Sequence, residues 1–172
     1  AMALADVAGW DALAQAAGLP LGRCLGADPR PIPAYNSNGL GLMPTGALAD
    51  EAEQLLGAGF RAVKLRLGYA TVEEDVAAVR AVRKRVPDEV AVMVDYNQAL
   101  SVAEAIRRGR ALDGEGVYWI EEPIRHDDYP GCAEMARVVS TPVQIGENFS
   151  QVYDMRHALD AHACDLVMPD LE

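Results

Sequence analysis

Three acidic residues, each just after a short apolar run, are the residues of this sequence best placed to do chemistry. Asp95, Glu121 and Glu147 lie at equal intervals along the chain. Three carboxylates that meet in one place repel one another strongly unless a cation lies among them. Oxygen ligands without Cys or His suit Mg²⁺ better than zinc. The pattern therefore predicts a Mg²⁺ site, although any single one of these acids could instead cap the helix that follows it.

Two cations and a further acid occupy comparable positions. Lys64 and Arg66 are two residues apart in the apolar run before the one that ends at Asp95. Side chains of a strand alternate, so both cations should share one face while Leu65 packs on the other. Asp170 follows the last apolar run. Lys64 and Arg66 would place positive charge next to the predicted metal.

The elements that must position these residues recur regularly. Six apolar runs follow one another at steps of about 24 to 29 residues, the length of one strand, one helix and two short loops. Because the runs do not alternate with polar residues, they indicate parallel strands buried on both faces. Thr71 with Glu74, and Ser101 with Glu104, match the capping box that begins a helix. The runs are 32–35, 62–65, 90–94, 117–120, 142–145 and 166–168.

Six strand–helix units predict an α/β fold, namely an incomplete TIM-type (β/α) barrel that lacks its last two strands. A full barrel has eight units and about 250 residues. An open sheet of six strands would leave two uncovered edges, so we favour a fragment of a longer protein. A doubly wound sheet is the alternative, but no GxGxxG or P-loop follows any run. We expect residues 1–25 to form a helix leading into the barrel, and residues 26–172 to form the partial barrel domain.

Composition excludes several classes of partner. The 172 residues carry a formal net charge of −11, which disfavours binding to a phosphate backbone, so no nucleic acid partner is expected. No apolar run approaches the ~18 residues of a membrane span, so no membrane partner is expected either. The three cysteines are odd in number and form no CxxC pair, which favours reduced thiols and a cytoplasmic location.

The motifs together resemble the barrel portion of the mandelate racemase branch of the enolase superfamily. They occur in the order and at the spacing of that family, and Ala34-Tyr35-Asn36-Ser37 is similar to its first strand. The small domain that caps the barrel in that family has no counterpart here. The remaining matching motifs are Lys64-x-Arg66, Val94-Asp95-Tyr96-Asn97, Trp119-Ile120-Glu121-Glu122-Pro123, Gly146-Glu147-Asn148 and Met168-Pro169-Asp170.

The resemblance implies a reaction and roles for the site residues. It implies abstraction of a proton α to the carboxylate of a small 2-hydroxy or sugar acid, through an enediolate stabilised by Mg²⁺. The full-length form would be a homo-oligomer. Asp170 would orient a His as an acid–base pair. The other roles are metal ligation by Asp95, Glu121 and Glu147, charge stabilisation by Lys64 and Arg66, and substrate binding by Ser37 and Asn97.

Two departures from the family pattern bear on the reaction. Racemases of the family use the second Lys of Lys-x-Lys as a base, and here that residue is Arg66. A guanidinium stays protonated, with a pKa above ~12, so an acid-sugar dehydratase is favoured over a racemase. The His partner of Asp170 would lie on a seventh strand, and His126, His157 and His162 do not replace it. We therefore expect the chain alone to be inactive.

Two other interpretations stay open. The chain could be a non-catalytic remnant that binds metal without turnover. It could also belong to an enzyme similar to muconate cycloisomerase, but that branch carries a Lys on the sixth strand where this chain has Asp170.

Overall fold

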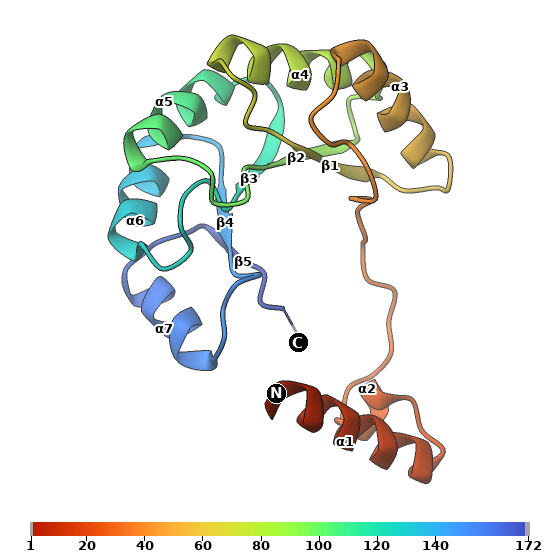
Figure 1. Ribbon diagram of the computed structural model, residues 1–172. Coiled ribbons are helices and arrows are strands. Elements are labelled where there is room, and N and C mark those ends of the chain that lie inside the picture. The colour runs from red at the N-terminus through yellow and green to blue at the C-terminus, as the bar shows by residue number, and fades with distance from the viewer. Residues whose placement is uncertain (1, 171–172) are drawn as a thin grey trace. The chain divides into compact units, whose positions relative to one another are not determined.

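The computed structural model describes residues 2–170 (Figure 1). The chain divides into two compact units, and the boundary between them in the sequence falls between Pro33 and Ala34. The first unit contains α1 (Met2–Ala17) and α2 (Leu21–Cys24), two helices in the segment for which one helix was expected. α1 is followed by Gly18, whose φ of 66° lies in the left-handed region that glycine adopts without a steric penalty. No helix among the described residues is long and apolar enough to span a bilayer.

The second unit is a curved parallel sheet with helices on one side. Its five strands pair in chain order, and a helix joins each strand to the next. In Figure 1 the strands lie along the inner side of an arc and the helices along the outer side. This is an α/β architecture in which five consecutive units form part of a barrel. The elements are α3 (Thr45–Leu56), β1 (Ala62–Arg66), α4 (Val72–Arg85), β2 (Ala91–Asp95), α5 (Val102–Leu112), β3 (Val117–Glu121), α6 (Tyr129–Val138), β4 (Val143–Ile145), α7 (Val152–Asp160) and β5 (Leu166–Val167).

The strand expected at 32–35 is wrong, so the sheet has five strands where six were predicted. In this part of the chain only an isolated bridge forms, between Asn36 and Val63. The Asn36 amide donates to the carbonyl of Ala62, and the Lys64 amide donates to the carbonyl of Asn36. Pro33 lies within the expected run and has no N–H to donate, so pairing starts only beyond it.

The outer face of the sheet packs against the helices to form the core. Leu65, Val94 and Ile120 are fully buried and belong to the main apolar cluster. The Thr71 capping box at the start of α4 is confirmed in both directions. At α5 only half of the second box forms: the Ser101 side chain accepts from the Glu104 amide, but the Glu104 carboxylate binds Arg107 and Arg108 instead. Charged partners outcompete a neutral amide for that carboxylate.

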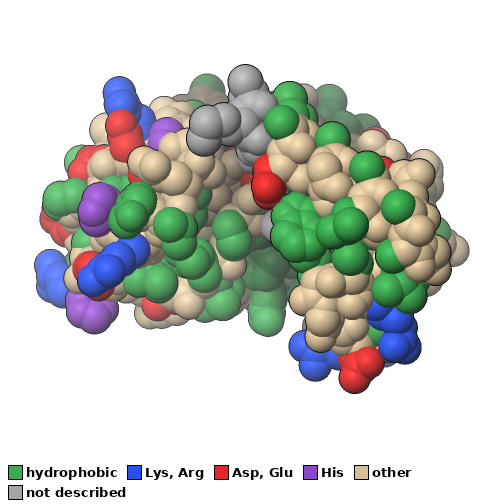
Figure 2. All heavy atoms as spheres, turned by 90° about the horizontal axis from the view of Figure 1, so that it is seen from below, with side chains coloured by type: hydrophobic (Ala, Val, Ile, Leu, Met, Phe, Trp, Pro, Cys, Tyr) green, Lys and Arg blue, Asp and Glu red, His purple; other side chains and the backbone are tan. Residues whose placement is uncertain are grey.

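The last described strand leaves apolar side chains exposed. Leu166 and Val167 of β5 are 38% and 39% exposed, and Val152 and Tyr153 of α7 are more exposed still. Figure 2 shows hydrophobic side chains open to solvent among charged ones on one side of the molecule. The last described strand therefore presents apolar side chains to solvent.

Candidate functional site

The strand register places the predicted charged residues side by side. Arg66 pairs with Asp95 across β1 and β2, and Asp95 pairs with Glu121 across β2 and β3. Residues paired across a sheet point to the same face, and all three lie at the carboxyl ends of their strands. In a parallel barrel this end carries the active site.

Lys64 is the central cation of this cluster. Its Nζ lies 2.5 Å from Oε1 of Glu121 and 3.5 Å from Oδ2 of Asp95. It also lies 5.6 Å from the centre of the Tyr35 ring, within the range of a cation–π contact. Burial lowers the pKa of Lys64, but the hydrogen bond and the charge of Glu121, with the charge of Asp95, outweigh burial and raise it. Lys64 is therefore a firmly held ammonium group at neutral pH.

Arg66 completes the positive side of the site. Its Nη2 lies 3.4 Å from Oδ2 of Asp95, and its side chain is 39% exposed. Leu65, between the two cations, is fully buried in the opposite direction. The predicted alternation is confirmed: Lys64 and Arg66 share the face that carries Asp95 and Glu121.

The third predicted ligand reaches the cluster through an asparagine. The backbone amide of Asn97 donates to Oδ1 of Asp95 at 2.7 Å, while its Nδ2 lies 3.4 Å from Oε1 of Glu147. Asn97 thus joins two of the three predicted metal ligands. Within residues 2–170, no three acidic, His or Cys side chains stand close enough together to hold a metal ion as arranged. Metal ligation by the three acids stays a prediction.

Glu122 is a site residue that the sequence reasoning missed. It is fully buried and has a φ of 35°, unusual for a residue with a side chain. Asn148 Nδ2 donates to its Oε2 at 2.6 Å, but its Oε1 is buried without a hydrogen-bond partner. Burial, and then the charge of Glu147, raise the pKa of Glu122 to about 7. The doubled acid at the end of β3 was the available signal.

Two aromatic residues also frame the site without having been predicted. Trp119 Nε1 lies 3.3 Å from Oε2 of Glu121, and the Tyr35 ring meets the Trp119 ring edge-on with centroids 5.8 Å apart. Tyr35 Oη contacts Met168 Sδ at 3.4 Å. These contacts bring the segment before β1 together with the segment after β5, at the same end of the sheet.

The other predicted residues lie nearer the rim. Ser37 is exposed, next to the Asn36 bridge, and Asp170 is exposed beyond β5. The His126 backbone amide donates to Oε1 of Gln98, and its ring nitrogen Nδ1 also contacts that oxygen. His157 packs against Tyr129, on the helical layer.

The donor chemistry of the cluster fits Mg²⁺. Asp95, Glu121 and Glu147 offer only hard oxygen ligands, and no Cys or His lies among them. The partnerless oxygen of Glu122, the residue after Glu121, is a further buried oxygen acceptor at this end of the sheet. Lys64 now contacts both Asp95 and Glu121, so a cation bound by these two acids would share them with the ammonium group. Because the group is surplus in acid, a divalent cation would relieve repulsion there.

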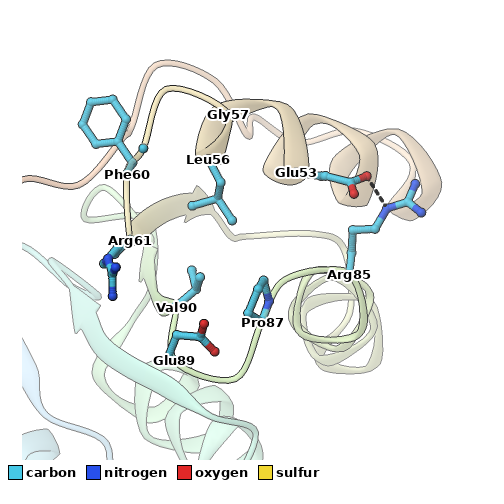
Figure 3. Close-up of a pocket in the computed structure, with 10 residues that line it drawn as sticks. Glu53, Leu56, Gly57, Phe60, Arg61, Arg85, Pro87, Glu89 and Val90 are labelled. Atoms are coloured by element: carbon cyan, nitrogen blue, oxygen red, sulfur yellow. Dashed lines mark ion pairs between the residues drawn. The ribbon is translucent and has the colours of Figure 1, made fainter.

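A hollow of about 550 Å³ lies at the opposite, amino-terminal end of the sheet (Figure 3). It is lined by Leu56, Phe60 and Pro87 among others, with the ion pair of Glu53 and Arg85 at one side. None of the predicted site residues lines it. The charged cluster and this hollow are therefore separate features of the same sheet.

Comparisons with known protein sequences and structures agree on the family that this chain resembles. The enolase C-terminal domain-like family matches residues 47–172. The chain is 36% identical to 3,6-anhydro-alpha-L-galactonate cycloisomerase of Streptomyces coelicolor, over 99% of this chain and 47% of that protein. It is 34% identical to L-talarate/galactarate dehydratase of Salmonella typhimurium, over 96% of this chain and 42% of that protein. The chain thus spans less than half the length of these curated relatives.

Solved structures give the same picture. An enolase from alpha proteobacterium BAL199 with bound Mg superposes with a TM-score of 0.91 at 45% identity, over 94% of this chain and 46% of that one. L-talarate dehydratase from Polaromonas sp. JS666, complexed with Mg and L-glucarate, gives 0.87 at 35% identity, over 96% and 46%. The match covers most of this chain and extends through every strand that carries the charged cluster, so the chain belongs to the enolase C-terminal domain-like family, among relatives of the mandelate racemase branch of the enolase superfamily.

Proposed function

We propose that the protein containing this chain removes a proton α to the carboxylate of a small 2-hydroxy or sugar acid, and that it does so with Mg²⁺. The observation that carries the proposal is the pair of cations, Lys64 and Arg66, set against Asp95 and Glu121 at the carboxyl ends of adjacent strands. Relatives named as dehydratases and cycloisomerases of sugar acids support this substrate class.

Asp95, Glu121 and Glu147 would hold the metal. When bound, Mg²⁺ supplies positive charge that stabilises the enediolate formed from the substrate carboxylate. Asn97, already hydrogen-bonded to Asp95 and near Glu147, would bind a substrate hydroxyl beside it. Ser37, exposed at the rim, would do the same from the segment before β1.

The cations have distinct tasks in this proposal. Lys64 is a partly buried ammonium group whose raised pKa keeps it charged, so it would bind and neutralise the substrate carboxylate. Arg66 would add a second positive charge and cannot readily accept a proton. Asp170 would orient a His supplied from outside the described residues. With one base in place of two, dehydration is favoured over racemisation.

A second candidate is a metal-binding piece without turnover. It is favoured by the coverage of less than half of the relatives' length and by the lack of a complete base among Lys64, Arg66 and Asp170. The two candidates differ in one measurable property, which is whether the α-proton of a substrate exchanges with solvent.

The experiment is exchange of the α-proton in D₂O, followed by NMR, for a panel of 2-hydroxy and sugar acids with Mg²⁺. We expect exchange by the full-length protein and none by the 172-residue chain alone. Glu121→Gln in the full-length protein should abolish the exchange. Metal-dependent exchange by the short chain that is lost in Arg66→Met would show that Arg66 is the base. No exchange by the full-length protein with any acid would refute the proposed reaction.

A further inference from the structure

A second charged cluster lies beside the site but on the helical side of the sheet. It consists of Asp75 at the start of α4, Tyr96 just after β2, and Arg108 on α5. We propose that Asp75, with Tyr96 and Arg108, positions Asp95 and the end of β1 for metal binding. The inference rests on the proposed function and adds positioning residues to it.

Asp75 is the hub of this cluster. Its side chain is fully buried, and its two oxygens accept from four donors. Oδ1 accepts from the backbone amides of Gly68 at 3.0 Å and Tyr69 at 2.9 Å, while Oδ2 accepts from Tyr96 Oη at 2.8 Å and Arg108 Nη1 at 2.6 Å. A carboxylate that accepts from four donors is fixed in position.

Arg108 closes the cluster from the next helix. Its side chain is 7% exposed, and its Nη1 also donates to the carbonyl of Tyr69 at 3.0 Å. Its Nε donates to Glu104 Oε1 at 2.7 Å. Loop 68–69, helix α4 and helix α5 are therefore tied together by one buried ion pair.

The cluster acts at the points where β1 and β2 end. Gly68 is two residues after Arg66, and Tyr96 directly follows Asp95. The backbone amide of Leu67 donates to the carbonyl of Asp95 at 2.9 Å, which joins the two strand ends to each other. Asp75 thus fixes the backbone just after β1 and just after β2. A change of backbone conformation at either place would rotate Arg66 or Asp95 away from the site.

Helix capping does not account for Asp75. Thr71 already caps α4, with Glu74 returning the bond, so the helix start is satisfied without Asp75. Net stability is a weak reason to bury an ion pair, because well-packed apolar residues of similar volume often do as well or better. What the pair supplies here is a fixed geometry at two strand ends that carry site residues.

The test is calorimetric titration with Mg²⁺, together with the electron paramagnetic resonance spectrum of bound Mn²⁺. We expect Asp75→Asn, which keeps the size of the side chain and removes its charge, to weaken Mg²⁺ binding by about 10- to 100-fold, as loss of a residue that orients a metal ligand does. Tyr96→Phe, which removes one donor, should weaken it less. Both variants should broaden the Mn²⁺ spectrum, which a loss of stability alone does not do.

Val79→Ala is the matched control. Val79 lies on the same helix and is fully buried, but its apolar side chain can make none of the hydrogen bonds of the cluster. It should lower the melting temperature at least as much as Tyr96→Phe and leave the dissociation constant of Mg²⁺ within about two-fold. A dissociation constant that follows melting temperature across all three variants would overturn the inference, and so would wild-type affinity in Asp75→Asn. If Asp75→Asn does not fold, unchanged affinity in Tyr96→Phe overturns it.

Glu121→Gln separates the failure of this inference from the failure of the proposed function. If wild type and Glu121→Gln bind Mg²⁺ equally, the proposed metal site is wrong and the positioning role falls with it. If Glu121→Gln loses binding while Asp75→Asn and Tyr96→Phe keep it, the metal site stands and the positioning role alone is wrong.

Discussion

The two ends of the same five strands treat charge in opposite ways. At the carboxyl end, Asp95 and Glu121 are buried, and Lys64 and Arg66 are drawn in beside them. At the amino end, the hollow of Figure 3 is bordered by Arg85, whose partners Asp50 and Glu53 are largely open to solvent. Both ends carry ion pairs, but only those at the carboxyl end are largely removed from water, which costs desolvation free energy.

We interpret this as the difference between a functional site at the carboxyl end and an ordinary solvated surface at the amino end. Exposed ion pairs contribute little and cost little, so their presence at the amino end needs no further reason. Buried acids without full compensation, as at Glu122, are costly and persist where a site requires them. The comparison therefore assigns the chemistry to the carboxyl end, and substitutions at the two ends should differ in size.

The largest effect is expected from Glu121→Gln at the carboxyl end. Because Glu121 is proposed to bind the metal directly, its loss should weaken Mg²⁺ binding by about 100-fold or more, beyond the effect of a residue that only orients a ligand. At 25 °C this equals about 2.7 kcal/mol of binding free energy. Calorimetric titration measures it, with Glu53→Gln at the amino end as the control that should bind as wild type does.

Glycines at the two ends give the next largest difference. A Cβ at Gly146, which precedes Glu147, would lie 2.8 Å from the backbone of Met168, and φ there is 142°. A Cβ at Gly59, at the amino end, would meet nothing within 4 Å, although φ is 89°. Both alanine variants carry backbone strain, but only Gly146→Ala adds a clash with backbone, so it should cost about 2 kcal/mol more. If the two variants had equal free energies of unfolding in urea, the close approach of the segments that follow β4 and β5 would be contradicted.

A smaller effect should appear as a pH dependence at Glu122. Its pKa is raised from 4.5 to about 7 in the folded protein, so the folded state binds more protons than the unfolded state between these values. Stability therefore falls as pH rises through this interval. Glu122→Gln removes the titrating group and should melt at a higher temperature than wild type at pH 8, with the difference shrinking toward pH 5. Melting curves in EDTA measure this, and a difference independent of pH would contradict the raised pKa.

The smallest effect belongs to the ion pair at the amino end. Glu53 and Arg85 are 64% and 44% exposed, so Glu53→Gln should change the free energy of unfolding by less than about 1 kcal/mol. The change should shrink further in high salt, since salt screens exposed charges. A loss above 2 kcal/mol, measured in urea at low salt, would show that the two ends do not differ as the comparison states.

Much of the fold followed from local pattern. Apolar runs without alternation predicted parallel strands at β1 to β5, and Thr71 with Glu74 predicted the start of α4. The strand prediction at 32–35 was wrong because it rested on apolar content alone, which does not reveal that Pro33 has no N–H for pairing. Likewise, Ser101 with Glu104 has the spacing of a capping box, but the spacing does not reveal that Arg107 and Arg108 compete for the carboxylate.

For the site, the sequence by itself determined which side chains share a face. Strand periodicity fixes that Lys64 and Arg66 point one way and Leu65 the other, because successive Cβ atoms alternate whatever the surroundings. Only the tertiary structure decided which groups meet: Lys64 with Glu121, Glu122 with Asn148, and Asp75 with Tyr96 and Arg108. These partners come from different strands and helices, and their pairing depends on register, burial and side-chain reach, which no local pattern encodes.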